Sequence, residues 1–588
     1  MPVLLKNKQF LYYSRLCVLG VRQDIAITLD EVAEAMFTSS RHCRTLLREM
    51  QALGWLAWSP KVGRNQRSGL YLNYSLPSLK AEIAQSMIAE GKYERALALI
   101  DNDQALFGQL LKKTSGTNRR EGRLHIQLTY TRAFSPLLPH YAARNSERFF
   151  LRQIYSCLTQ CDAFGNVTAD LAHHWAFDEN TLQWRFYLRP QLVFDDGSEL
   201  DATTVAALFS RLKQRDVYRQ ELEHVVSIEA VSSQCVVFTL NQSDWGFAGL
   251  LADVRYAIQP VSQLEAAPTI VGSGVFRVQE HSGQRLKLEA NGSYHGYRAL
   301  ADTVSIWQVP APLVGREDTK GPASKATLDD AMVGDGGTCA NYLSLSGSKA
   351  PDHRQRSRLE DGCLLALVNR HADLNVLQRR YLAQLFASDE LVDQFRHTNS
   401  AIDVVPAYNL LPQWLKVASP CLVEPSLPAR ISIGIYRQQA LQAAAQTVLH
   451  LLAQVGVQCD ITVYAFDEFS RMAQEGALRE DLLITSLNFD DNRPSSAFRW
   501  MLSNPVLYQC LASSEIEWLR CELTRIRQTQ KLPDYLDQLE VIATALIADG
   551  RLLPIFHHQQ VLNFDDVLKG VAINVWGWPE LRDVWSED

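Results

Sequence analysis

The sequence has no uninterrupted apolar run of about 18 residues, so it offers no candidate transmembrane helix. Charged and polar side chains interrupt the first stretch, MPVLLKNKQF, and no small-residue cleavage site follows it, which argues against a secretory signal. The 11 cysteines are odd in number and form no CxxC pair; Cys157 and Cys161 come nearest, four positions apart. These absences predict a cytoplasmic protein with reduced thiols.

Motifs for catalysis are also missing. We find no glycine-rich phosphate loop, no GxSxG sequence and no catalytic triad order, so we expect neither an enzyme nor a bound cofactor. The histidine pairs His173-His174 and His557-His558 raise a metal site as an alternative. No cysteine or carboxylate spacing accompanies either pair, and the sequence therefore predicts no metal.

Overall positive charge is lacking too, because the 588 residues carry a formal net charge of −7. The charge is uneven, however. Between Arg41 and Arg67 the only acid is Glu49, and it stands against six bases: Arg41, Arg44, Arg48, Lys61, Arg64 and Arg67. A small basic segment on a large acidic chain is typical of a DNA-binding module attached to a larger domain, although a solvated helix face would have the same composition.

Two short helices are predicted around this basic segment. Thr28 and Glu31 form a capping box that opens the first helix, TLDEVAEAM. A turn at residues 37–39 follows, and Ser39 or Ser40 caps a second helix that ends at Gly54. Two strands around a basic loop come next, so residues 28–72 read as a winged helix-turn-helix.

The second helix has two faces. Its apolar residues recur at helical spacing and predict a buried stripe: Cys43, Leu46, Leu47, Met50 and Leu53. Arginine suits both guanine edges and phosphate, and a wing usually meets phosphate. We therefore predict DNA contacts from the polar face of the helix and from the hairpin: Arg41, His42, Arg44, Thr45, Arg48, Lys61, Arg64 and Arg67.

The composition divides the chain into three parts. Residues 1–76 hold the predicted DNA-binding domain. Residues 77–123 read as a helical connector that ends in a polar, basic linker, TSGTNRREGR. From residue 124 to residue 588, short strands alternate with helices, as in an α/β body of more than one lobe.

Specific motifs refine the expectation for this last part. Ile154-Tyr155, Leu171–Trp175, Phe186–Gly197 and Ala202–Val205 resemble the signature of the family 5 solute-binding proteins, the peptide- and nickel-binding class. VGSGVFRV at 271–278 and the segment 553–585 extend the resemblance, with departures at Gln191-Leu192-Val193, Ser273 and Val275. The resemblance implies a two-lobed fold of the periplasmic-binding-protein type (type II), with ligand held between the lobes. The Gly-rich and Asp-rich segment 309–350 departs from the family pattern and reads as a loop.

The same resemblance suggests ligand-binding positions. Tyr130, Arg132 and Phe134 follow the first strand, and Asn488, Asp490 and Arg493 precede a helix near the C-terminus. Asp490 falls where peptide-binding members carry an aspartate for the ligand's amino group. An anionic ligand, such as a sugar phosphate, would instead suit Arg132 or Arg493.

Taken with RHCRTLLREMQALGWLAWSPKVGRNQRS at 41–68, the whole chain resembles the SgrR family of transcriptional regulators. The resemblance implies a protein that binds promoter DNA, senses a small molecule and is linked to sugar-phosphate or transport stress. RNA polymerase is a further expected partner. A second hypothesis is a cytoplasmic peptide or solute carrier whose N-terminal module contacts proteins. Steep salt dependence of DNA binding distinguishes the two.

Overall fold

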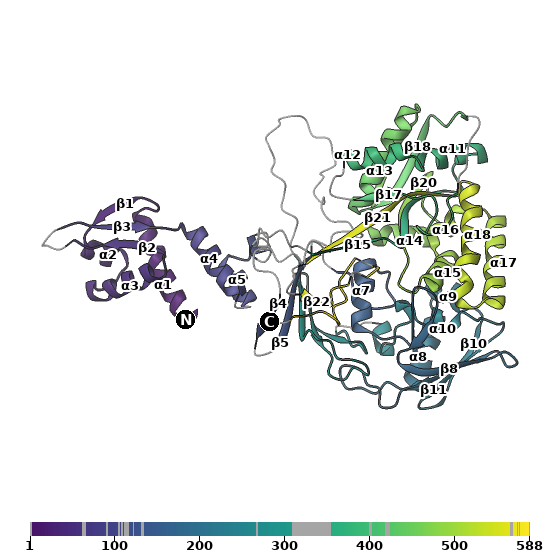
Figure 1. Ribbon diagram of the computed structural model, residues 1–588, viewed down its shortest axis with the longest axis horizontal. Coiled ribbons are helices and arrows are strands. Elements are labelled where there is room, and N and C mark those ends of the chain that lie inside the picture. The colour runs from purple at the N-terminus through teal and green to yellow at the C-terminus, as the bar shows by residue number, and fades with distance from the viewer. Residues whose placement is uncertain are drawn as a thin grey trace. The chain divides into compact units, whose positions relative to one another are not determined.

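The computed structural model describes residues 3–61, 66–89, 92–103, 106–107, 110, 117–120, 123–130, 134–265, 269–308, 354–398, 403–417, 424–564, 568–572, 574–575 and 577–586. The chain forms two compact units, Met1–Thr114 and Ser115–Asp588. Each is taken separately below, with the elements labelled in Figure 1. Segment 309–350 lies outside the described residues.

The first unit begins with a winged helix-turn-helix. Its elements are α1 (Val3–Leu16), β1 (Asp24–Ile27), α2 (Leu29–Ala35), α3 (Ser40–Ala52), β2 (Leu56–Ser59) and β3 (Ser68–Leu72). The strands form an antiparallel sheet in the order β1-β3-β2. Thr28 and Glu31 form the predicted capping box at the start of α2. Gly54 follows α3 with φ of +73°, the left-handed conformation for which glycine is best suited.

Helix α1 and strand β1 were not predicted from the sequence. Tyr13 of α1 is fully buried, and its hydroxyl lies 3.1 Å from Trp55 O and accepts from Tyr74 N at 3.0 Å. The Tyr13 ring also packs edge to face on Trp55, with 5.8 Å between ring centroids. These contacts tie α1 to the chain on both sides of the β2–β3 hairpin, and they join segments that are about 40–60 positions apart.

The connector contains two helices, α4 (Leu76–Ala89) and α5 (Tyr93–Leu99), which pack against each other. The prediction of a linker over residues 114–123 is wrong for the second half of that segment. Thr117–Arg120 forms strand β4, which pairs antiparallel with β5 (Arg123–Tyr130) in the second unit. β4 is the last strand of its sheet, and an edge strand tolerates the polar sequence TNRR that suggested a linker.

The first lobe of the second unit is built mainly on two larger sheets. A five-stranded sheet, in the order β12-β13-β14-β5-β4, adds β12 (Phe276–His281), β13 (Arg285–Ala290) and β14 (Thr303–Gln308). A four-stranded antiparallel sheet, in the order β10-β11-β9-β8, is made of β8 (Ala172–Asp178), β9 (Gln183–Leu188), β10 (Val225–Ser232) and β11 (Cys235–Leu240). The helical elements of this lobe include α7 (Asn145–Ile154), α8 (Ala202–Lys213), α9 (Asp216–Leu222), α10 (Phe247–Leu250) and the 3-10 turn η2 (Val254–Tyr256).

The second lobe is built on a mixed seven-stranded sheet. Its main path is β15-β21-β16-β20-β18-β19, with β17 also paired to β21. The strands are β15 (Arg354–Leu359), β16 (Gly362–Val368), β17 (Val404–Pro406), β18 (Arg430–Tyr436), β19 (Gln458–Tyr464), β20 (Leu482–Asn488) and β21 (Leu552–Phe564). Helices around it are α11 (Val376–Phe386), α12 (Asp389–Thr398), α13 (Gln439–Gln454), α14 (Phe466–Gln474), α15 (Arg493–Ser503), α16 (Pro505–Cys510), α17 (Ser513–Thr529) and α18 (Tyr535–Ala548).

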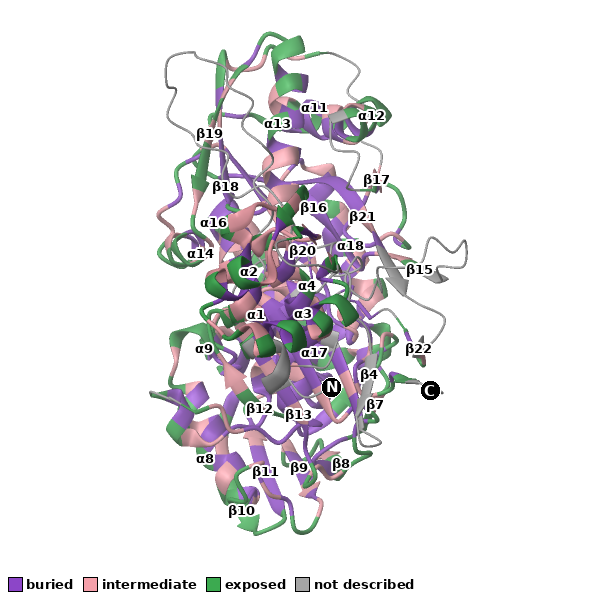
Figure 2. Cartoon of the chain, turned by 90° about the vertical axis from the view of Figure 1, so that its left-hand side faces the viewer, coloured by how far each residue is buried: buried purple, intermediate pink, exposed green. Residues whose placement is uncertain are grey.

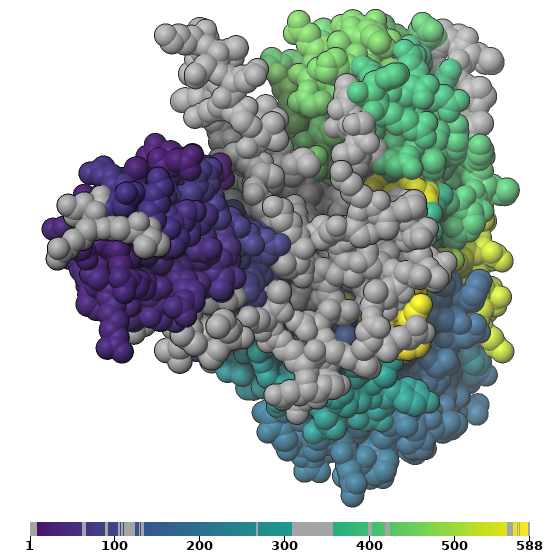
Figure 3. Space-filling model, turned by 60° about the vertical axis from the view of Figure 1, so that its left-hand side comes forward, coloured from purple at the N-terminus to yellow at the C-terminus, as the bar shows by residue number. Residues whose placement is uncertain are grey.

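Separate apolar cores support the three larger sheets. Figure 2 shows strands such as β11 and β21 largely in the purple of buried residues. In Figure 3 the colours separate the lobes, with green residues of the second lobe above the blue and teal residues of the first. The predicted two-lobed α/β fold of the C-terminal part is confirmed, together with the winged helix-turn-helix.

Candidate functional site

Helix α3 presents one apolar and one basic face. Ser39 caps it by accepting from His42 N at 3.3 Å. The predicted apolar residues Cys43, Leu46, Leu47 and Met50 are buried, and Leu53, just after the helix, is half-buried. Four residues at the same helical spacing, offset by two positions, are exposed: Arg41, Arg44, Thr45 and Arg48. Burying the first stripe therefore turns the second stripe outward.

The arginines of this basic face are available for a partner. Within the described residues, neither Arg41, Arg44 nor Arg48 forms an ion pair with an acidic side chain. Glu49, the only acid of α3, accepts from Gln9 Nε2 at 2.8 Å. Ser40 Oγ donates to Asp30 of α2 at 2.6 Å, which holds the two helices of the motif together.

The remaining predicted DNA-binding residues differ in their surroundings. His42 is half-buried and packs edge to face on Tyr12 of α1, with 5.9 Å between ring centroids. Lys61 is exposed beside the hairpin. Arg67 Nη1 donates to Ala26 O at 3.3 Å, and Nη2 lies 3.7 Å from Glu31. Arg64 lies outside the described residues.

In the second unit, Tyr130 and Phe134 lie together. Their rings stack with 4.9 Å between centroids, and Trp578 lies 5.6 Å from the Tyr130 ring. The Tyr130 hydroxyl is 2.7 Å from Ser146 Oγ in the first turn of α7. Arg132, between the two aromatic residues in sequence, lies outside the described residues.

Asn488 is the last residue of β20, Asp490 lies in the turn that follows, and Arg493 is the first residue of α15. Asp490 is fully buried, and its carboxylate accepts a hydrogen bond from the guanidinium of Arg148 on α7. Arg493 Nε lies 2.8 Å from Asp361, which also pairs with Arg358. The two groups of predicted ligand residues therefore meet through α7, because Ser146 contacts Tyr130 and Arg148 contacts Asp490.

More contacts join the two lobes beside this turn. Arg499 of α15 lies 2.8 Å from Asp253, a fully buried residue at the start of η2. Burial favours the neutral form of Asp253, but Arg499 and Arg148 outweigh it and hold the pKa of this carboxyl below its usual range. Ser503 of α15 donates to Glu221 of α9 at 2.7 Å.

Several charged residues around the Asp490 turn were not predicted from the sequence. Glu360 is buried, and burial together with the neighbouring charge of Asp361 raises its pKa to about 8. Burial likewise raises the pKa values of Asp491 and Glu580. Arg148, separated from Asp490 by 342 positions, belongs to no motif that could have marked it.

The histidine pairs occupy separate places. His173 and His174 are exposed on β8. His557 is buried, and its Nδ1 lies 2.6 Å from Gly362 O; His558 Nδ1 is 4.0 Å from Glu360. Across the described part of the chain, His, Cys, Asp and Glu do not gather in threes as a metal site requires. None of the helices described there has the length and hydropathy to cross a bilayer.

Comparisons with protein families match both units. Residues 8–122 match the N-terminal domain model of the sugar transport-related sRNA regulators (SgrR_N), and residues 166–316 match the middle part of bacterial extracellular solute-binding proteins, family 5. The HTH-type transcriptional regulators SgrR of Shigella dysenteriae serotype 1 and of Escherichia coli O157:H7 are each 29% identical over 595 residues, which cover 100% of this chain and 99% of each relative.

Solved structures resemble the second unit. NikA from Brucella suis in complex with Fe(III)-EDTA aligns with a TM-score of 0.61 at 16% identity, covering 79% of this chain and 100% of NikA. The oligopeptide-binding protein AppA from Bacillus subtilis in complex with a nonapeptide aligns with a TM-score of 0.60 at 16% identity and with the same coverage. At this identity the likeness establishes the two-lobed fold alone.

Proposed function

The chain belongs to the SgrR family of HTH-type transcriptional regulators, and from that premise we propose that it binds promoter DNA through α3 and responds to a small anionic ligand in its second unit. The observation that carries the DNA assignment is the exposed stripe of Arg41, Arg44 and Arg48, because no acidic partner neutralises it within the described residues. Such a helix suits the major groove, where arginine reads guanine.

The ligand assignment rests on the surroundings of Asp490. The resemblance to peptide-binding proteins implies that an aspartate at this position binds the ligand's amino group. Here the carboxylate already has a cation, because Arg148 donates to it. A ligand with a free ammonium group would have to displace Arg148 from a fully buried carboxylate, which is costly. An amine-terminated peptide is therefore a poor fit.

The nearby charges favour an anion instead. Two arginines, Arg358 and Arg493, share the single carboxylate of Asp361. Burial raises the pKa values of Asp491 and Glu580 and so weakens the tendency of these two carboxyls to ionise. Arg358 and Arg493 thus have one carboxylate between them, and guanidinium groups bind phosphate and carboxylate in a bidentate geometry.

The biological setting follows from the relatives' names. Because these name a sugar transport-related regulator, we assign a phosphorylated sugar as the first ligand to test and genes of sugar uptake or sugar-phosphate stress as the targets. The protein would work in the cytoplasm, where its DNA lies, and a contact with RNA polymerase would let it activate transcription.

The DNA assignment is tested by fluorescence anisotropy with DNA from upstream of the protein's own gene. The double variant Arg44→Ala, Arg48→Ala should weaken binding by at least about 30-fold, because each substitution loses a base or phosphate contact worth about 1–3 kcal/mol. Arg95→Ala, an exposed arginine on α5, is the matched control and should bind normally. Wild-type affinity should also fall steeply between 50 and 200 mM salt, as counterion release requires.

The carrier hypothesis predicts different results in that experiment. A protein-binding N-terminal module would give no sequence-selective DNA affinity and no steep salt dependence. Equal binding by the Arg44 and Arg48 variant and by the Arg95 control would refute the assignment of α3 as the recognition helix.

The ligand class is tested separately by isothermal titration of the full chain with sugar phosphates, their parent sugars and an unblocked tripeptide. We expect a sugar phosphate to bind at least about tenfold more tightly than its parent sugar, a difference of about 1.4 kcal/mol. Preference for the tripeptide would overturn the anion assignment and leave the DNA assignment untouched.

A further inference from the structure

A small, partly open depression lies between helices of the two lobes, apart from the Asp490 turn. One wall is the C-terminal end of α9, with Gln220 and Glu223. The opposite walls are α15 and α17. Phe498, Leu502 and Leu523 give the depression an apolar base, and all three are buried.

The polar side of this depression is formed by one face of α17. Arg520, Thr524 and Arg527 line it, and their spacing of four and then three positions places them on the same side of the helix. Arg520 lies over the ring of Tyr508, 5.6 Å from its centroid. Two guanidinium groups and a hydroxyl therefore converge on a surface with an apolar base.

Arg527 is the buried member of this group and is only 3% exposed. Its Nε lies 3.1 Å from Asp244, and its Nη1 lies 3.2 Å from His224 Nδ1. Its Nη2 is buried and has no hydrogen-bond partner among the described residues. A buried guanidinium N–H without an acceptor is costly, so an acceptor brought by a ligand would be stabilising.

The acids near the depression limit the charge of such a ligand. Asp244 is already shared between His224 and Arg527. Glu223 lies at the rim and is exposed, so water screens it from the arginines. Glu223 would nevertheless repel a dianion more than a monoanion.

We propose that this depression is a second ligand site, one that binds a small monovalent carboxylate with a short hydrocarbon part. The carboxylate would accept from Arg527 Nη2 and from the guanidinium of Arg520. The hydrocarbon part would lie on Phe498, Leu502 and Leu523. Because α9 and α15 belong to different lobes and already touch through Glu221 and Ser503, an occupant would stabilise their contact.

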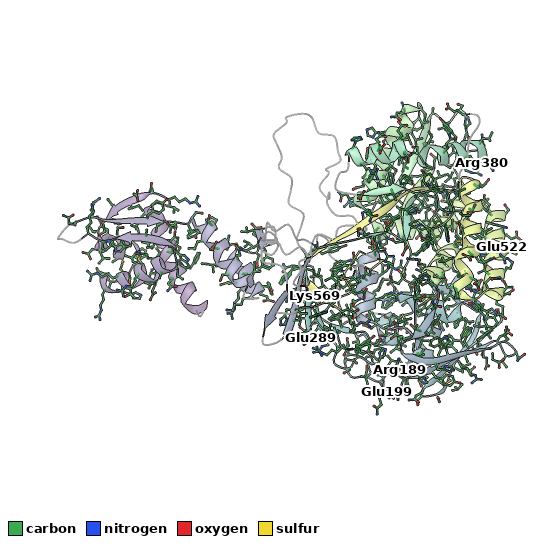
Figure 4. The ribbon with its side chains drawn as sticks, in the orientation of Figure 1. Arg189, Glu199, Glu289, Arg380, Glu522 and Lys569 are labelled. Carbon is green, nitrogen blue, oxygen red and sulfur yellow. The ribbon has the colours of Figure 1, made fainter. Side chains whose placement is uncertain are left out.

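Butyrate, acetate and inorganic phosphate are the probes, titrated into the full chain and followed by ligand-observed NMR. Arg520→Gln changes an exposed residue, so it should preserve the fold. Arg525→Gln is the matched control on the same helix, because Arg525 pairs with Glu522 and lines no part of the depression; Glu522 is labelled in Figure 4.

We expect saturable butyrate binding that weakens about tenfold in Arg520→Gln and is unchanged in Arg525→Gln. Acetate should bind more weakly than butyrate because it buries less apolar surface. Three results would each overturn the proposal: no saturable binding of butyrate, equal binding by both variants, or tighter binding of phosphate than of butyrate. None of them bears on the Asp490 turn, because Arg520 is not part of it.

Discussion

The guanidinium of Arg148 on α7 donates to the carboxylate of Asp490, a fully buried residue in the turn before α15. This pair joins the first lobe to the second. It also occupies the carboxylate that resembles the amine-binding position of peptide-binding proteins. The pair therefore bears on both the stability of the second unit and the choice of ligand.

Removing one member of this pair should destabilise the second unit. Arg148→Met removes the cation that donates to the buried Asp490 carboxylate and should lower the free energy of unfolding by about 3 kcal/mol. Combining it with Asp490→Leu should recover most of that loss, because a buried pair replaced by apolar side chains is often neutral. Urea denaturation followed by tryptophan fluorescence measures both variants. If Arg148→Met alone were as stable as the wild type, the ion pair between Arg148 and Asp490 would not contribute to stability.

Glu360 should make the second unit less stable as pH rises. Its folded pKa is about 8 and its ordinary value is 4.5, so the folded state keeps a proton that the unfolded state releases between these values. The unfolded state therefore binds fewer protons in this window, and the free energy of unfolding falls from pH 4.5 to pH 8.

Thermal unfolding of Glu360→Gln at pH 5.5 and pH 7.5 measures this contribution. The amide cannot ionise, so the decline in melting temperature between the two pH values should be smaller than in the wild type. Other buried carboxyls such as Asp491 act in the same direction in both proteins and cancel in the comparison. Identical declines would mean that Glu360 does not titrate in this window.

The capping box of α2 should stabilise the first unit. Thr28 Oγ1 accepts from Glu31 N at 3.3 Å, and Glu31 accepts from Thr28 N at 2.8 Å. Thr28→Ala removes the first bond and should cost about 1 kcal/mol of unfolding free energy. The measurement is the rate of amide hydrogen exchange in α2, recorded on the full chain of the wild type and of the variant. Exchange in α2 that stays at the wild-type rate would contradict this role.

The sequence predicted those features that depend on neighbouring residues. Thr28 and Glu31 are three positions apart, and the buried and exposed stripes of α3 follow directly from helical periodicity. α1 was missed because its burial is decided by contacts of Tyr13 with Trp55 and Tyr74, far along the chain. β4 was missed because an edge strand can be as polar as a linker.

In the candidate ligand site, too, local features could be predicted and contacts between distant segments could not. Motif resemblance proposed Tyr130 and Asp490 as ligand residues, and the aromatic stack of Tyr130 on Phe134 joins two residues that are close in sequence. The partners of Asp490 and Arg493 could not be predicted, because Arg148 and Asp361 come from distant segments and no local pattern pairs an arginine with a particular carboxylate. The charge balance that favours an anion emerged only from these pairings.

The central claim is that one chain couples a small anion to DNA affinity, and a single titration tests it. The full chain is added to labelled DNA from upstream of its own gene, with and without saturating sugar phosphate, and to a shuffled DNA of equal length. We expect selective binding whose dissociation constant changes at least about fivefold with the ligand, the lower range of allosteric coupling. Equal affinity for the shuffled DNA, or an unchanged constant with every anion tried, would contradict the account.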